Sequence, residues 1–249
     1  MKTTLCKPGR LVVGAQFFGK PAAAVFAFVF LALLPATGRA DMEFSGVLGY
    51  IKTSAPAGGW TILSAPFNST GAGDALSMDE FLPDAPTGTK VWFYVTDDYE
   101  TETKTAFQGW LPGTHLLARG QAVFVQVPDP EGVETVTFTT CGEVPTVADY
   151  PETTLHLVGG AWRMLSFPYP EGRTLSSTQL GRTATPGDRL IYWDPDALNG
   201  TGDWVNAVWC AYPEPHWSRD ITLEAGAGYF HYRSGGDAEV IEPVPYTAP

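Results

Sequence analysis

The segment 194–203 carries side chains suited to binding a cation. Its oxygen donors are Asp194, Asp196, Asn199 and Asp203, and the glycines among them let the chain turn sharply. Calcium prefers such hard oxygen ligands, which makes calcium a possible cofactor, although the spacing differs from that of an EF-hand. Asp, Asn and Gly also favour tight turns, so an acidic hairpin turn is the alternative interpretation. A second acidic segment, 97–102, occupies the corresponding place earlier in the chain.

A group of aromatic and acidic residues follows directly. It comprises Trp204, Tyr212 and Trp217, with Asp203 and Glu214 beside them in sequence. Sugar rings stack on exposed aromatic side chains, and carboxylates accept hydrogen bonds from sugar hydroxyls. This group therefore predicts a glycan-binding surface. The alternative is that the rings belong to the core, where most aromatic side chains of small β proteins lie.

Catalytic chemistry has weaker support. Paired carboxylates such as Asp79 and Glu80 could hydrolyse a glycosidic bond, but their separation cannot be measured in a sequence. The chain has no phosphate-binding glycine loop, zinc signature or nucleophile elbow. Ser64 and Ser166 recur in a repeated motif, yet a catalytic serine needs a positioned base, and the histidines do not recur with them. We therefore predict no catalytic residues and no enzymatic activity.

Two cysteines, Cys141 and Cys210, remain once an N-terminal leader containing Cys6 is set aside. In an oxidising compartment they permit one disulfide. Because they lie at non-equivalent places in the two repeats described next, such a bond would join one repeat to the other. Two distant cysteines do not by themselves make a metal site.

A duplicated motif defines the elements that must position these groups. The pattern W-x-x-L-S-x-P occurs at 60–66 and again at 162–168. Further matching pairs are Gly88 to Tyr94 with Gly187 to Trp193, Trp110 with Trp209, and Gly120 to Phe124 with Gly226 to Phe230. We interpret the chain as two tandem homologous domains, 41–147 and 148–249. The repeated residues are expected to encode the fold, with function where the copies differ.

The elements of each copy are predicted to be strands. Short β-branched and aromatic runs such as 91–95 and 122–127 are bounded by turn residues, which is typical of strands. Short helical turns are expected at 76–82 and 175–180. The fold class is therefore all-β, with two β-sandwich or barrel-like domains; a single fused sandwich or barrel that exchanges strands is the alternative. In the repeated motif we expect one large buried ring, Trp60 or Trp162.

The same motifs carry a resemblance. Gly59-Trp60, Leu63-Ser64, Pro66 and 120–125, with their counterparts in the second copy, resemble a secreted bacterial β-module that occurs in tandem and has strand motifs GW-x-L-x-S-x-P and G-x-G-Y-F/W-V. The first copy departs from the second motif at Ala122-Val123. The resemblance implies an extracellular, non-catalytic architecture over nearly the whole chain after residue 40.

The first 40 residues are predicted to be a signal peptide. Basic residues precede an apolar run, 22–34, that is too short to span a membrane and ends in a small-residue site near Ala40. Removing five positive charges leaves a net charge of 10 − 27 = −17. This acidity argues against a nucleic-acid partner, and no membrane span is expected after cleavage. We expect a secreted, periplasmic or cell-surface protein that acts as a structural or binding component, with a glycan or a surface protein as partner; a secreted glycan-binding protein is the specific alternative.

Overall fold

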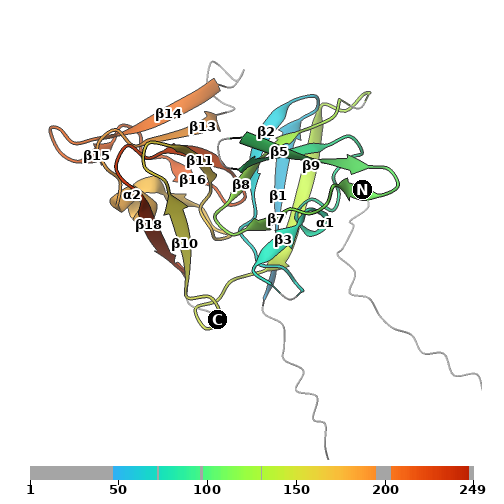
Figure 1. The fold of residues 1–249 in the computed structure, drawn as a ribbon, viewed down its shortest axis with the longest axis horizontal. Coiled ribbons are helices and arrows are strands. Elements are labelled where there is room, and N and C mark those ends of the chain that lie inside the picture. Colours follow the sequence, from blue (N-terminus) through green and yellow to red (C-terminus); the bar gives the residue numbers. More distant parts are fainter. Residues whose placement is uncertain (1–46, 72, 96–97, 130, 195–202, 247–249) are drawn as a thin grey trace, which may run out of the picture. The chain divides into compact units, whose positions relative to one another are not determined.

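The computed structural model describes residues 47–71, 73–95, 98–129, 131–194 and 203–246. The predicted all-β class is confirmed: the described chain consists mainly of strands in several sheets, with short helices (Figure 1). All described residues belong to one compact unit. Within them, no helix combines the length and apolar character that crossing a bilayer requires.

We call residues 47–143 the first half. Its elements are β1 (Leu48–Pro56), β2 (Trp60–Ser64), β3 (Ala75–Ser77), α1 (Met78–Phe81), β4 (Lys90–Val95), β5 (Asp98–Thr105), β6 (Gly109–Leu111), β7 (Leu116–Ala118), β8 (Ala122–Gln126) and β9 (Thr135–Glu143). The main sheet has the order β2-β8-β4-β5-β6, and the pairs β1-β9 and β3-β7 complete the half.

We call residues 152–246 the second half. Its elements are β10 (Glu152–Leu157), β11 (Trp162–Leu165), β12 (Arg173–Thr174), η1 (Leu175–Ser177), α2 (Gln179–Arg182), β13 (Arg189–Asp194), β14 (Asp203–Cys210), β15 (His216–Trp217), β16 (Thr222–Leu223), β17 (Tyr229–Tyr232) and β18 (Ala238–Pro243). The main sheet has the order β11-β17-β13-β14-β15, and the pairs are β10-β18 and β12-β16. The second half thus repeats the strand arrangement of the first, element for element.

Each half has its own apolar core on the inner side of its main sheet. In the first half, Leu63, Val91 and Val125 of the sheet pack with Phe138 of β9 and with α1. The second half packs Leu165, Leu190 and Tyr229 with Leu155 and Val240 of the β10-β18 pair. The predicted helical turns lie beside these cores. Ser77 begins α1 by accepting a hydrogen bond from the backbone N–H of Glu80, a standard way to satisfy a free helix-end donor.

Paired contacts of the repeated residues join the two halves. The backbone N–H of Ser64 donates to the carbonyl of Gly226 at 2.9 Å, and that of Ser166 donates to the carbonyl of Gly120 at 3.0 Å. Both glycines have φ of +80°, which an L-residue rarely adopts. The repeated serine of each half therefore meets the repeated glycine of the other half. A third apolar cluster, containing Ile62, Ala122 and Met164, fills the junction.

Candidate functional site

The outer surfaces of the two main sheets carry a continuous group of aromatic rings, which we call the aromatic face. Its members are Trp60, Trp92, Tyr94, Tyr99 and Phe124 in the first half and Trp162, Trp193, Trp204, Phe230 and Tyr232 in the second. Four of these rings are exposed, namely Trp60, Tyr99, Trp193 and Trp204, and the other six are half-buried. Contiguous exposed apolar side chains mark interaction sites. The aromatic face is thus the leading candidate site.

Strand alternation explains why these rings point outward. Trp60 and Leu63 are three residues apart, so they lie on opposite faces of β2. Leu63 enters the core at 2 % exposure, while Trp60 remains 46 % exposed. The expectation of a buried ring in the repeated motif was therefore wrong for Trp60, and Trp162 is only half-buried. The leucine of the motif occupies the core instead.

The rings form an unbroken series across the junction. Phe124 of β8 and Phe230 of β17 meet edge to face with centroids 5.1 Å apart. On one side of them, Trp60 lies 6.0 Å from Phe124; on the other, Trp162 lies 6.4 Å from Phe230. Edge-to-face contacts at such distances are favourable and hold rings in fixed orientations. The aromatic face therefore presents one preformed surface built equally from both halves.

Polar side chains lie among the rings. Lys90 is the register partner of Gln126, and Arg189 is the register partner of Tyr232. Thr101 lies opposite Trp92 on β5. Partners in an antiparallel pair project from the same side of the sheet. The surface thus combines ring faces with cationic, amide and hydroxyl groups that can form hydrogen bonds.

The residues that sequence predicted for a glycan site do not converge. Only Trp204, 43 % exposed, belongs to the aromatic face. Trp217 is 5 % exposed and donates its indole N–H to the carbonyl of Gly181 at 3.2 Å. Tyr212 and Glu214 are exposed in the turn beyond β14. Because a strand rises about 3.3 Å per residue, the length of β14 separates this turn from Trp204 and from Asp203 at its other end.

Strand register also corrects one of the repeat pairs. Lys104 is paired with Trp110, and Trp209 is paired with Trp217. Trp217 therefore corresponds to Trp110, and both are buried core rings. The sequence match of Trp110 with Trp209 was wrong, because insertions shift the spacing between β5 and β6. By the same register Trp204 corresponds to Tyr99, so the aromatic face is shared by both halves.

Two of the four predicted calcium ligands can be placed. Asp194 and Asp203 face each other at the end of the β13-β14 pair, and the Asp203 carboxylate accepts a hydrogen bond from the Trp204 backbone N–H. Asp196 and Asn199 lie outside the described residues. Among the described residues, no group of three or more His, Cys, Asp or Glu side chains is arranged to hold a metal. Calcium binding at this turn stays a prediction.

The cysteines are placed on different sheets. Cys141 lies on β9 opposite Tyr50, and Cys210 ends β14 opposite His216. No disulfide joins them in the structure, and the bond that the sequence permits stays a prediction. The Cys210 thiol lies 3.7 Å from the carbonyl of Val208.

Sequence reasoning missed a histidine held between two carboxylates. His115 Nδ1 lies 2.8 Å from Glu102 and its Nε2 lies 2.7 Å from Glu100, while the ring stacks on Phe93 at 4.3 Å. Burial alone would lower the pKa of His115, but hydrogen bonds to Glu102 and Glu100 raise it overall. The alternating Glu100 and Glu102 of β5 were only a weak sequence signal for this cluster, because His115 comes from a separate loop.

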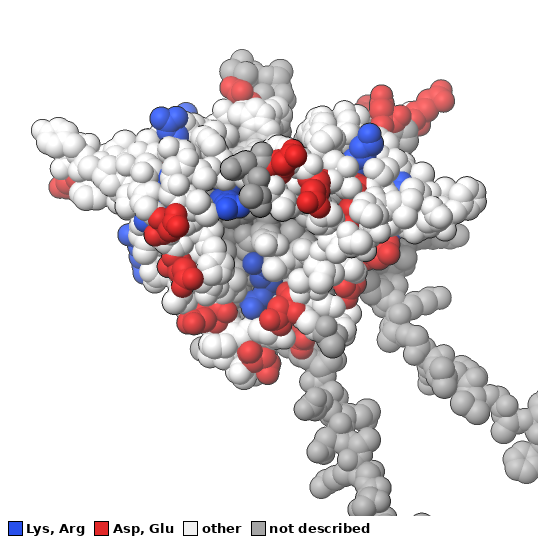
Figure 2. All heavy atoms as spheres, viewed as in Figure 1, with Lys and Arg blue, Asp and Glu red and all other residues white. Residues whose placement is uncertain are grey.

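Acidic side chains are distributed over both halves on the face shown in Figure 2; basic side chains are fewer, and some of them lie in the hollow between the halves. Comparison with protein-family models, with curated proteins and with solved structures finds no match to this chain.

Proposed function

We propose that this protein is an exported, non-enzymatic binding protein whose aromatic face binds a glycan. The observation that carries the proposal is the continuous series of exposed and half-buried rings across both halves, interspersed with polar groups. A sugar ring presents an apolar C–H face and a rim of hydroxyls, which matches rings flanked by Lys90, Gln126 and Thr101. Export is supported by the leader-like composition of residues 1–40.

The arrangement favours an extended ligand. Rings from both halves lie in contact through Phe124 and Phe230, so one surface could bind several consecutive sugar units. Many weak stacking contacts then add up, which is how a shallow site reaches useful affinity. Two homologous domains packed into one binding unit is the organisation that we propose, consistent with the matching strand orders.

A glycan array tests the proposal. We expect the wild type to bind polysaccharides, and the double variant Trp60→Ala/Trp162→Ala to bind about tenfold more weakly or worse, because each lost ring removes roughly 1 kcal/mol of stacking. Tyr212→Ala serves as the control, since Tyr212 is 87 % exposed and lies off the aromatic face.

The result that would reject a glycan partner is equally direct. If the wild type bound no polysaccharide on a broad array, or if the double variant bound as well as the Tyr212→Ala control, the aromatic face would have another role. A surface protein would then be the remaining partner class, and cross-linking to a cell-surface extract would be the next measurement.

A further inference from the structure

Two crevices lie between the halves and differ in charge. Crevice 1, of about 600 Å³, is lined by the end of β4, residues 115–123, β10 and β11. Crevice 2, of about 500 Å³, is lined by the corresponding segments with the halves exchanged: the end of β13, residues 221–229, β1 and β2. The matching strand orders thus produce a matching pair of crevices, so a change made in one can be compared with the equivalent change in the other.

The charged residues of the two linings have opposite signs. Among the described residues, crevice 1 is lined by Arg119 and Arg163, by two histidines and by no Asp or Glu. Three carboxylates outside the lining pair with the histidines: Glu100 and Glu102 with His115, and Glu239 with His156. The described lining of crevice 2 contains Asp194 and Glu224 and no Arg, Lys or His. In a protein with 27 acidic and 15 basic residues, two arginines in one lining without an acidic neighbour among its described residues are a local exception. A cleft lined by one sign of charge attracts ligands of the opposite sign.

Arg163 is the arginine of crevice 1 without an aromatic or acidic partner among the described residues. Its Nε is buried and forms no hydrogen bond, and the described residues contain no carboxylate in ion-pair contact with it. A buried guanidinium N–H without a partner is costly, so a ligand that accepts from it gains more than usual. The equivalent position in the first half is Thr61, by the alignment of Trp60 with Trp162.

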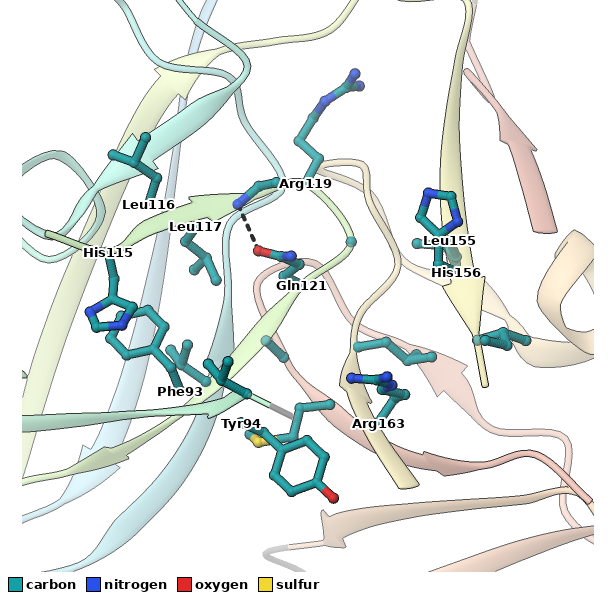
Figure 3. Close-up of a pocket in the computed structure, with 18 of the residues that line it drawn as sticks. Phe93, Tyr94, His115, Leu116, Leu117, Arg119, Gln121, Leu155, His156 and Arg163 are labelled. Atoms are coloured by element: carbon teal, nitrogen blue, oxygen red, sulfur yellow. Dashed lines mark hydrogen bonds between the residues drawn. The ribbon is translucent and has the colours of Figure 1, made fainter. Parts of the chain in front are cut away.

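The other basic groups of the lining have partners, although Arg119 also keeps one buried N–H, at Nη1, that forms no hydrogen bond, and His156 lies 3.4 Å from Glu239. Arg119 lies over the rings of Tyr150 and Tyr169, 5.0 Å and 5.9 Å from their centroids. His115 is held by its two glutamates. In Figure 3, Arg119 extends away from Tyr94, whereas Arg163 lies on the Tyr94 side of the crevice. Among the described residues, Arg163 is thus the arginine of crevice 1 that has neither an ion pair nor a ring contact.

Crevice 1 is continuous with the aromatic face. Tyr94 is a member of that face through its contact with Tyr99 at 5.2 Å, and it also lines the crevice. Met164 lines the crevice and packs in the same cluster as Phe124 and Phe230. A chain of sugars on the aromatic face could therefore place one substituent into the crevice.

Resting on the proposed function, we infer that crevice 1 binds the acidic substituent of an anionic sugar, with Arg163 as the anchoring group. The planar guanidinium forms paired hydrogen bonds with a carboxylate or a sulfate. His231, opposite Arg163 in the β11-β17 pair, has its pKa lowered to about 4 by burial and is neutral at physiological pH. It therefore adds no competing charge.

Paired oligosaccharides test the inference by calorimetry or fluorescence. The probes are uronate oligosaccharides, the same oligosaccharides after reduction of the carboxyl groups, and sulfated oligosaccharides. We expect the wild type to bind an acidic form about ten- to a hundredfold more tightly than its neutral form, the range expected for a charge-assisted hydrogen bond. Preference for uronate or for sulfate identifies the substituent.

The variant Arg163→Thr carries the residue that the first half has at this position, so it should fold. We expect it to lose the preference for the acidic form and to bind the neutral form as the wild type does. Arg163→Lys should recover part of the preference, because lysine keeps the positive charge but lacks the paired N–H donors of the guanidinium. Thr61→Arg, the matched change in crevice 2, should not reproduce the preference in an Arg163→Thr background.

Two outcomes overturn the inference and are separable from the fate of the glycan proposal. If neutral glycans bind through the aromatic face but acidic forms bind no better, the inference fails and the proposed function stands. If an acidic form binds preferentially and Arg163→Thr retains that preference, the anchor is assigned wrongly. If neither form binds, both proposals fail.

Discussion

At the scale of single residues, one buried ion pair distinguishes the halves. Asp188 is fully buried, lies 2.8 Å from Arg233, and accepts hydrogen bonds from the backbones of Thr185 and Ser234. Burial would raise the pKa of Asp188, but these hydrogen bonds lower it overall. The corresponding positions in the first half are occupied by the uncharged Thr89 and Val127.

Removing one partner of this ion pair should lower the free energy of unfolding strongly, whereas replacing both partners should lower it little. We expect Arg233→Val alone to reduce the free energy of unfolding by about 3–5 kcal/mol, because it leaves a buried carboxylate unpaired. The double variant Asp188→Thr/Arg233→Val, which copies the first half, should recover most of that loss in urea unfolding. Equal losses in both variants would contradict this account.

The ion pair also predicts acid sensitivity. Since the folded state lowers the pKa of Asp188 below its ordinary value of 3.8, its stabilising contribution is present above that pH. It is lost as the pH falls through the lowered pKa. We expect the melting temperature of the wild type to fall more steeply below about pH 4 than that of the Asp188→Thr/Arg233→Val variant. Parallel pH profiles would show that Asp188 is not responsible.

At the scale of elements, the turns at Gly120 and Gly226 connect strand geometry to the junction. Both have φ of +80° and present their carbonyls to the serines of the opposite half. A Cβ at Gly120 would lie 2.3 Å from the Leu155 side chain, whereas one at Gly226 would lie 3.1 Å from Ile51. The two turns share a backbone conformation but differ in the space available for an added Cβ.

We therefore expect Gly226→Ala to destabilise the protein by about 1–2 kcal/mol through the positive φ alone. Gly120→Ala should cost more, because Leu155 must also move. Chemical denaturation measures both, with Gly71→Ala as a control at an exposed glycine without positive φ. A larger loss of unfolding free energy for Gly226→Ala than for Gly120→Ala would contradict the prediction that the contact with Leu155 adds to the cost.

At the scale of the whole molecule, the halves share buried surface. Met164 from the second half is 8 % exposed and packs with Ile62 and Ala122 of the first. Backbone bonds cross the junction at both repeated serines. Neither half buries its side of this surface alone, so each half should be less stable without the other.

Unfolding should accordingly occur in one step. We expect a single calorimetric transition for the wild type and two for Met164→Asp, because a charge in the junction is costly while the two cores remain apolar. The control is Leu116→Asp, which places the same charge at an exposed position and should leave a single calorimetric transition. Two transitions in the wild type would show that the halves are energetically independent.

The amino-acid sequence determined the fold class and the positions of most strands, because alternating apolar residues and glycine turns are local signals. It also identified the motif that repeats, with Ser64, Ser166, Gly120 and Gly226 as its framework residues. Trp204, which the sequence named as a ligand-binding residue, lies on the aromatic face, and its role stays a prediction. These features depend on neighbours in the chain, so a single sequence carries them.

Only the tertiary structure decided which rings face outward and which residues meet. The sequence favoured a buried ring at Trp60, but Leu63 occupies the core and Trp60 lies on the outer face. Trp217 proved to be the core partner of Trp209, because strand pairing depends on register between segments that the sequence does not link. Arg163 reached a crevice only because the two halves pack against each other. Such long-range contacts arise from the packing of the whole chain, and local sequence patterns do not specify them.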